Sequence, residues 1–421
     1  MSRAIVTPTP TPADDAVRLV LAAARALHAA GTTAQRLEES LELLARRLGL
    51  EHPQFFSTPT SIMASFGPDE RQQVHLLRVE PAGVNIGRLS ELDRIVMQVL
   101  AGRLGTRDAL ARVREVEAAP SPYGPLATVL AFGLASAGVA RFLGGGTREL
   151  VAGGALGLLT GALEAAAERT PGLARVFEPL AAFCAAFLAT SLAALQGAYA
   201  VYTATLAGII VLLPGLVLTN AVRELATRHL ASGSARLLYA VMILLGLVFG
   251  VALGDRLAEA LFGAVTAAAP VALPVWTAVA AVLATGASFV VILKGDRQDA
   301  AWMVASGAAA YVAGRIGARW VGAELGLFLA ALLGGVASAW WGRVQDRPQA
   351  IVLVPGILML VPGSLGFRSL SNLLERDVIS GVQTAFTMIL AATALSAGLL
   401  VAGLLAPGRR VARHLDAPLL P

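Results

Sequence analysis

Apolar runs of about 18 to 22 residues follow one another from Tyr123 almost to the end of the chain, with short gaps between them. A helix needs about 20 mostly apolar residues to cross a bilayer, so each run is long enough for one span. The sequence therefore predicts an α-helical polytopic membrane protein with about ten transmembrane helices. The predicted spans are 123–142, 149–167, 176–195, 198–218, 234–253, 271–293, 299–317, 321–341, 350–366 and 382–405.

The charged residues fit this class of protein. Only 14% of the 421 residues are charged, against about 25% in soluble domains. The formal net charge of +5 could indicate a nucleic-acid partner, but the arginines lie mainly in the N-terminal part and in the gaps between apolar runs. This distribution favours a lipid bilayer as the partner rather than nucleic acid. The gaps on the side of the N-terminal domain hold more arginine and lysine than the gaps on the other side, which predicts that both termini are cytoplasmic.

Residues 14–118 have a different pattern, which predicts a small cytoplasmic α/β domain. DDAVRLVLAAARALHAAG and TTAQRLEESLELLARRLGL have helical periodicity, with Asp14 or Asp15 as the cap of the first helix. QFFSTPTSIMASF and QQVHLLRVEP are typical of strands, and a helical hairpin broken at Gly105 follows. Residues 1–13 are predicted to form a disordered Thr-Pro arm, and they lack the apolar core of a signal peptide.

No catalytic or metal-binding motif is present in the sequence. His28, His52 and His75 share no spacing, and the single Cys184 excludes an internal disulfide and a cysteine-based metal cluster. No P-loop or HExxH motif occurs, so we expect no catalytic residues, no metal, no cofactor and no ATP hydrolysis. A regulatory or structural role for the N-terminal domain is favoured over an enzyme.

An internal repeat relates the two halves of the membrane part. LAGIIVLLPGLVLTNAVRELATRHLASG and LVPGILMLVPGSLGFRSLSNLLERDVISG match at an offset of 148 residues, which pairs Pro214 with Pro362. The same offset pairs Gly215 with Gly363 and Arg228 with Arg376. It also carries the spans 149–167 and 176–195 onto 297–315 and 324–343.

The repeat predicts two five-span units, residues 123–268 and 270–407, before a cytoplasmic tail at 408–421. A unit that crosses the membrane five times leaves its second copy inverted, and inverted repeats with broken helices at the midplane are typical of secondary transporters. We expect the Pro-Gly breaks of the two halves to face each other. The break at Pro355-Gly356 keeps only a glycine in the first half, Gly208, so it is an elaboration of the second half.

Candidate functional residues cluster around these breaks. The candidates for the substrate site or pathway are Pro214, Gly215, Thr219, Asn220, Glu224, Pro355, Gly356, Pro362, Gly363 and Ser364. The candidates for ion coupling are Glu178, Glu324 and Asp377, because acids at membrane depth often carry protons. Glu178 and Glu324 lie near predicted helix ends, so simple exposure to water is an equal alternative for them.

These stretches resemble the threonine/serine exporter family (ThrE), in its form with both halves fused in one chain. The resemblance rests on HAAGTTAQRLEESLELLARRLG, LPGLVLTNAVRELATRHLASGSAR and VPGILMLVPGSLGFRSLSNLLERDVISG. It covers nearly the whole chain after residue 14. One departure is His229, which stands where the family pattern usually has an acid shortly before Ser-Gly; the second half keeps Asp377.

The resemblance implies a secondary active exporter, an antiporter that moves threonine- or serine-like amino acids out of the cytoplasm using the proton motive force. It implies residence in the bacterial inner membrane, with the amino acid and protons as partners. A dicarboxylate exporter of the succinate type stays open, as does a membrane-anchored module whose N-terminal domain carries the activity. A homo-oligomer stays open too.

Overall fold

The computed structural model describes residues 12–81, 83–265, 268–361 and 363–406. These residues form two compact units. The first unit comprises Met1–Pro120 and Glu224–Ala235, and the second comprises Ser121–Arg223 and Arg236–Pro421. The predicted arm and tail lie almost entirely outside the described residues.

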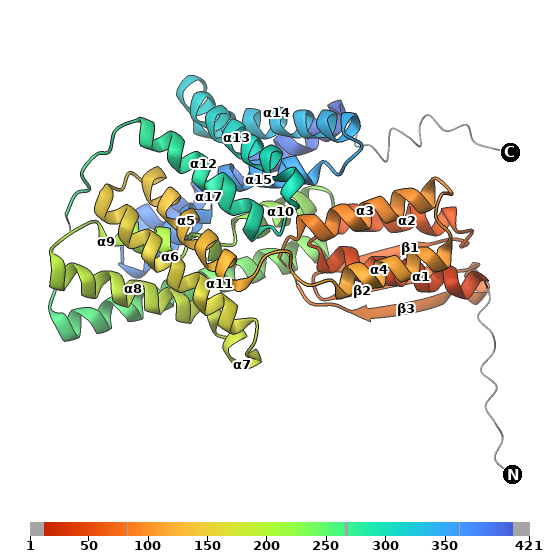
Figure 1. Ribbon diagram of the computed structural model, residues 1–421, viewed down its shortest axis with the longest axis horizontal. Helices are drawn as coiled ribbons and strands as arrows, with labels where there is room; N and C mark the ends of the chain where they lie inside the picture. Colours follow the sequence, from red (N-terminus) through yellow and green to blue (C-terminus); the bar gives the residue numbers. More distant parts are fainter. Residues whose placement is uncertain (1–11, 82, 266–267, 362, 407–421) are drawn as a thin grey trace, which may run out of the picture. The chain divides into compact units, whose positions relative to one another are not determined.

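The first unit combines four helices with a three-stranded antiparallel sheet of order β1-β2-β3 (Figure 1). The hairpin between β1 and β2 pairs Thr58 with Ser61, and β3 pairs with the other edge of β2. Ile62, Ala64 and Phe66 are buried on one face, as the alternation of a half-buried strand requires. The elements are α1 (Pro12–Ala29), α2 (Ala34–Arg47), β1 (Gln54–Thr58), β2 (Ser61–Phe66), the short 3₁₀ helix η1 (Asp69–Arg71), β3 (Gln73–Arg78), α3 (Ile86–Leu100) and α4 (Thr106–Ala118).

The helices of this unit follow their periodic apolar positions. Leu37, Leu41 and Leu44 form the buried face of α2, and Gly105 precedes the first residue of α4. Asp15 does not cap α1, because this helix already begins at Pro12; the Asp15 carboxylate instead accepts a hydrogen bond from Arg107 of α4 at 2.7 Å.

The second unit is entirely helical in the part that the structure describes, and every predicted span contains a helix. The helices that lie wholly or mostly in this unit are α5 (Pro125–Phe142), α6 (Thr147–Ala167), α7 (Pro171–Ala174), α8 (Phe177–Gln196), α9 (Val201–Gly208), η2 (Ile210–Leu212), α10 (Gly215–Ala226), α11 (Leu230–Phe262), α12 (Trp276–Ile292), η3 (Arg297–Asp299), α13 (Ala300–Trp320), α14 (Ala323–Val344), α15 (Ala350–Leu360), α16 (Gly363–Leu374) and α17 (Val378–Leu405). Within the described residues, 7 helices are long and apolar enough to cross a membrane, if α15 and α16 are counted together as the one stretch Ala350–Leu374, or 8 if the bent pair around η2 is also one span. The count of ten therefore stays a prediction.

Helices α5 and α12, the first of each predicted half, pack against each other in antiparallel directions. The Arg141 side chain, near the end of α5, donates to Thr277 at the start of α12 at 2.7 Å. At the opposite ends, the Tyr123 hydroxyl donates to the Gly295 carbonyl at 2.8 Å. Lys294 lies 3.8 Å from Glu168, so the end of α6 belongs to the same side as the start of α5.

The predicted break at Pro355 is wrong. Pro355 lies inside α15, which continues to Leu360 and ends only before Val361. Helix α13 packs closely on this stretch, since a Cβ on Gly307 would lie 3.9 Å from the Pro355 carbonyl oxygen. Membrane helices tolerate such a proline when neighbouring helices pack around it. Among the described residues of this stretch, α15 ends at Leu360 and α16 begins at Gly363, and Pro362 itself lies outside the described residues.

Candidate functional site

The helix breaks of the two halves meet at Gly215 and Gly363. A Cβ built on Gly363 would lie 3.3 Å from the Gly215 Cα, and a Cβ built on Gly215 would lie 3.1 Å from the Gly363 nitrogen. Both glycines are the first residues of short helices, α10 and α16. The chain reaches α10 through a 53° bend between α9 and the segment from η2 onward.

The two short helices have the same bounds at the offset of 148 residues, and so do the first residues of α11 and α17. Each short helix ends in a Schellman turn, in which Arg228 or Arg376 has a positive φ of 66°. The backbone nitrogens of His229 and Asp377 donate to the carbonyls of Glu224 and Asn372, both at 2.9 Å. An arginine in this conformation is strained, so two such turns at matched positions are a specific likeness between the halves.

The first helices of the halves correspond at 150 residues, not at 148 as the sequence match indicated. The Gly145 nitrogen donates to the Ala140 carbonyl and the Gly295 nitrogen to the Val290 carbonyl, both at 2.8 Å, so the turns after α5 and α12 have the same form. The predicted pairing of 149–167 with 297–315 is therefore two residues out of register. Apolar helices match at many offsets, which is why the sequence did not reveal the shift.

Two buried acids occupy equivalent positions at this corrected offset. Glu149 accepts hydrogen bonds from the backbone nitrogens of Gly146 and Ala200, both at 2.8 Å. Asp299 forms an ion pair with Arg347, which lies shortly before α15. Glu149 thus binds the chain just before α9, and Asp299 binds the chain shortly before α15. Both acids therefore have structural partners.

Each short helix also packs on the last helix of the other half. The Ser396 hydroxyl of α17 donates to the Thr219 carbonyl of α10 at 3.2 Å. Phe367 of α16, which corresponds to Thr219 at the offset of 148 residues, lies in one core cluster with Leu244 and Leu247 of α11. The two halves are therefore interlocked through α10 and α16.

Helices α10 and α16 begin beside each other, at Gly215 and Gly363, and run in opposite directions from there. Helix α10 ends just before α11 begins. A Cβ on Gly366 would lie 3.0 Å from Leu244, which is in the middle of α11. Glu375, directly after α16, is close enough to act electrostatically on Asp255 near the far end of α11. The ends of the two short helices thus lie at opposite ends of α11.

Several predicted pathway residues lie at or next to this junction. The Thr219 hydroxyl is buried and donates to the Gly215 carbonyl at 3.1 Å. Ser364 follows Gly363, and Asn220 follows Thr219. Ser396 was missed by the sequence reasoning, because only its contact with α10 distinguishes it from other helical serines.

Arg368 lies farther along α16, toward the end near Asp255. Its Nε atom is buried and has no hydrogen-bond partner among the described residues. Arg368 and Ser371 are polar neighbours of the Tyr202 hydroxyl on α9, and the Tyr202 ring lies 6.4 Å from that of Phe367. A guanidinium in this position could hold a carboxylate.

The end of α9, which precedes the Pro214-Gly215 break, is capped by a side chain from a neighbouring helix. The Thr160 hydroxyl of α6 is fully buried and lies 3.0 Å from the carbonyl oxygens of both Gly208 and Leu156. Gly208 is the last residue of α9, so its carbonyl lies where the regular helix stops. At the corrected offset Ala310 replaces Thr160, which fits the unbroken course of α15.

The predicted acids do not gather at the junction of Gly215 and Gly363. Glu178 lies in the first turn of α8 beside Tyr239, and Glu324 is exposed in the first turn of α14. Asp377 caps α17, and hydrogen bonds from Ser380 lower the pKa of its exposed carboxyl. Glu224 belongs to the first unit, where its carboxylate is fully engaged.

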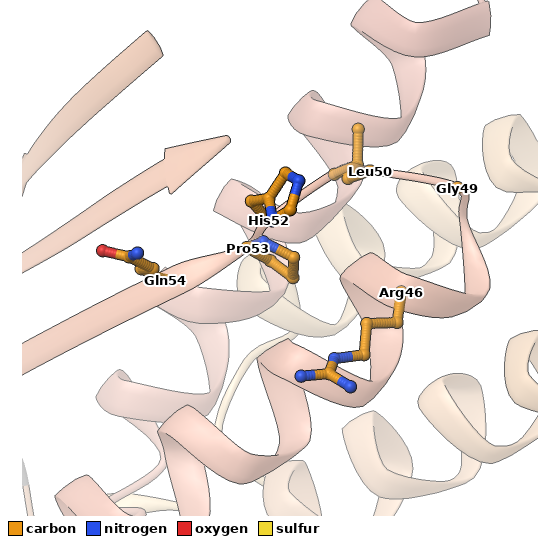
Figure 2. A pocket seen from close by; sticks show the side chains of 6 residues that line it. All are labelled: Arg46, Gly49, Leu50, His52, Pro53 and Gln54. Carbon is orange, nitrogen blue, oxygen red and sulfur yellow. The ribbon is translucent and has the colours of Figure 1, made fainter. Parts of the chain in front are cut away.

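The first unit has an open hollow beside the end of α2 (Figure 2). Its volume is about 560 Å³, and it is lined by Arg46, Gly49, Leu50, His52, Pro53 and Gln54. This lining contains one histidine and one arginine but no acid and no nucleophile. Over the described ranges of the chain, no three His, Cys, Asp or Glu side chains are placed to share a metal ion.

Two family models match the chain, one for each part. The ThrE model, described as "Putative threonine/serine exporter", matches residues 18–258, and the ThrE_2 model, described as "Threonine/Serine exporter, ThrE", matches residues 277–405. The gap between the two matches contains the predicted junction of the halves at 268–270.

Curated relatives include fungal proteins that are named as membrane proteins. The chain is 30% identical over 238 residues to the pheromone-regulated membrane protein 10 of Candida albicans (strain SC5314), which covers 55% of this chain and 21% of that protein. It is 26% identical over 389 residues to the protein of the same name in Eremothecium gossypii, covering 88% of this chain and 50% of that protein. The chain thus spans at most about half the length of these relatives. No solved structure matches it significantly.

Proposed function

Because the chain belongs to the ThrE family of threonine/serine exporters, we propose that it is a secondary active exporter of small amino acids of this type. It moves them out of the cytoplasm across the inner membrane of a bacterium. The observation that carries this proposal is the contact between Gly215 and Gly363. Two broken helices that meet at membrane depth expose backbone groups to a passing solute, as transporters require.

We further propose that the second unit consists of two inverted five-helix repeats. Three observations support the inversion: α5 and α12 are antiparallel, α10 and α16 diverge from a common start, and each short helix packs on the other half. A pseudo-two-fold axis in the membrane plane accounts for all three. It would place both termini on the cytoplasmic side.

The substrate passes along α16, from the junction at its start to Ser371, in this proposal. Arg368 and Ser371 receive its carboxylate, while Thr219, Ser364 and Asn220 contact its polar groups near the breaks. The prolines and glycines of the breaks, Pro214, Gly215, Pro362 and Gly363, shape the path. Helix α15 is continuous at Pro355, so Gly356 does not break it. Gly356 stays a pathway candidate because of its packing.

The proton motive force drives export in this proposal. Among the acidic candidates, Glu178 is the better proton carrier, because it is half-buried beside Tyr239. Asp377 is exposed and its lowered pKa keeps it ionised at neutral pH. Glu324 is exposed at the first turn of α14, which leaves it the weaker alternative.

Efflux from dipeptide-loaded cells tests the proposal. Cells that produce the chain take up serine- or threonine-containing dipeptides, hydrolyse them, and release the free amino acid. We expect release to exceed that of empty cells several-fold and to stop with an uncoupler. Release equal to that of empty cells would end the amino-acid proposal, and release that is insensitive to the uncoupler would end the proton coupling.

Export of dicarboxylates is the second candidate, because the buried Arg368 guanidinium could hold one carboxylate of such a substrate as well. A second carboxylate would need another fixed positive charge, whereas an amino acid needs only one. Parallel efflux measurements with succinate-loaded cells separate the two. Arg368→Gln should weaken export of either substrate at least tenfold, and Arg368→Lys should restore part of it.

A further inference from the structure

The first unit holds the α10–α11 turn, defined here as residues Glu224–Ala235. The Glu224 side chain is only 1% exposed. Its Oε1 atom accepts a hydrogen bond from the backbone nitrogen of Ala34 at 3.0 Å, and its Oε2 atom accepts one from the Ser232 hydroxyl at 2.8 Å. Ala34 is the first residue of α2, where the helix leaves a backbone N–H free and favours a negative charge.

A second contact lies one helical turn farther along α2. The His229 Nε2 atom is 3.5 Å from the Glu38 Oε2 atom. The other oxygen of Glu38 accepts hydrogen bonds from the backbone nitrogen and the hydroxyl of Ser57 on β1, at 2.7 and 2.6 Å. Ala34 and Glu38 are four residues apart, so both contacts arise from one face of α2.

The corresponding turn of the second half, between α16 and α17, shows that the backbone can form this turn without these contacts. It has the same Schellman geometry with Asn372 in place of Glu224 and Asp377 in place of His229. Asp377 caps its own helix through Ser380. An acid at position 229 would face Glu38 with like charge. Glu224 and His229 therefore serve the first unit rather than the turn itself.

We propose that the first unit is a clamp that fixes the C-terminal end of α10, so that Gly215 stays aligned with Gly363. Glu224 is the principal residue of this clamp, and His229 with Glu38 is the auxiliary pair. Helix α10 is only 12 residues long, so an anchor at Glu224 restrains its start at Gly215 directly. The role in transport rests on the proposed function, whereas the clamp itself does not.

Two substitutions remove the clamp without changing the backbone elsewhere. Ala34→Pro deletes the backbone N–H of Ala34 that donates to Glu224, and proline is favourable at the first position of a helix. The preceding residue, Thr33, has φ −71° and ψ 153°, which a following proline accepts. Glu224→Gln removes the charge that the N-terminus of α2 favours. Asn372→Asp is the matched control in the turn between α16 and α17.

Trypsin cleavage after Arg228 reports on the clamp, and cleavage after Arg376 is the internal control, because both arginines are exposed. In the purified full chain, we expect Ala34→Pro and Glu224→Gln to raise cleavage after Arg228 about tenfold and to leave Arg376 unchanged. Serine efflux should fall at least fivefold at equal amounts of protein in the membrane. The double variant should be no worse than the more affected single variant, since both changes act on the same bond.

Unchanged cleavage after Arg228 in both variants would overturn the clamp. Faster cleavage with full serine efflux would overturn its positioning role. If the unaltered chain exports no serine, the proposed function fails, but the cleavage ratio still decides whether the clamp exists. Additive losses in the double variant would contradict the pairing of Ala34 with Glu224.

Discussion

Gly215 and Gly363 begin two helices that diverge from one point; Gly215 has no room for a side chain, and a Cβ on Gly363 would be tight, at 3.3 Å from the Gly215 Cα. A Cβ on Gly215 would overlap with the Cγ1 atom of Val361. Because valine is branched at Cβ, it cannot easily turn away. The close approach of the two backbones therefore depends most strongly on glycine at position 215.

Gly215→Ala should reduce export at least tenfold, because it forces the two short helices apart at the junction. The matched control is Gly334→Ala in α14, where a Cβ would meet nothing within 4 Å. Initial rates of efflux at equal protein levels provide the measurement. The double variant with Val361→Ala should recover part of the rate by removing the clashing methyl groups; no recovery would show that the Val361 contact is not the cause.

Thr160→Val should destabilise the second unit by about 0.5 to 2 kcal/mol, since the buried Gly208 carbonyl loses its side-chain donor. Thr393→Val is the control, because Thr393 is exposed and donates only to the Ile389 carbonyl of its own helix. Unfolding in increasing denaturing detergent would measure both. Equal losses in the two variants would mean that the Gly208 bond contributes nothing specific.

Asp377→Asn should leave the pH dependence of export unchanged between about pH 5.5 and 8. Hydrogen bonds from Ser380 lower the pKa of Asp377 below its ordinary value, so the carboxyl stays ionised over this whole range. Its stabilising effect is present above about pH 4 and is lost only as the pH falls through the lowered pKa. A flattened pH profile in this variant would instead make Asp377 a proton carrier.

Single cysteines at positions 228 and 376 should react with a membrane-impermeant thiol reagent from opposite sides. The native Cys184 is first replaced by alanine, which leaves each chain with one thiol. The side chain at 228 should be labelled only in inside-out vesicles, and the one at 376 in intact cells. Labelling of both positions from the same side would refute the inverted arrangement.

The meeting of the two breaks could be predicted because Pro-Gly has a strong local effect and occurs at matched positions. Pro214-Gly215 does end a helix segment and begin another, as proline and glycine favour. Pro355 shows the limit of this reasoning. Its intrinsic effect is the same, but the packing of α13 beside it maintains the helix. Neighbouring helices of this kind cannot be read from a local motif.

Two other features depend on contacts that are distant in the sequence. Glu224 was grouped with the pathway because it follows the first break, yet its partner Ala34 is 190 residues away. The two-residue change in offset was hidden because the turn after α12 uses Lys294 where the turn after α5 uses Gly144. A lysine gives no sequence signal for the left-handed conformation that it adopts there.

The hydrogen bond between Ser396 and Thr219 also has a consequence for biogenesis. The two residues are 177 positions apart. At a synthesis rate of about 5 to 20 residues per second, α10 waits about 9 to 35 seconds before its helical partner α17 leaves the ribosome. During that time a short polar-faced helix must be kept from escaping the membrane or pairing wrongly. The nascent first half is therefore expected to depend on insertion chaperones until the last helix arrives.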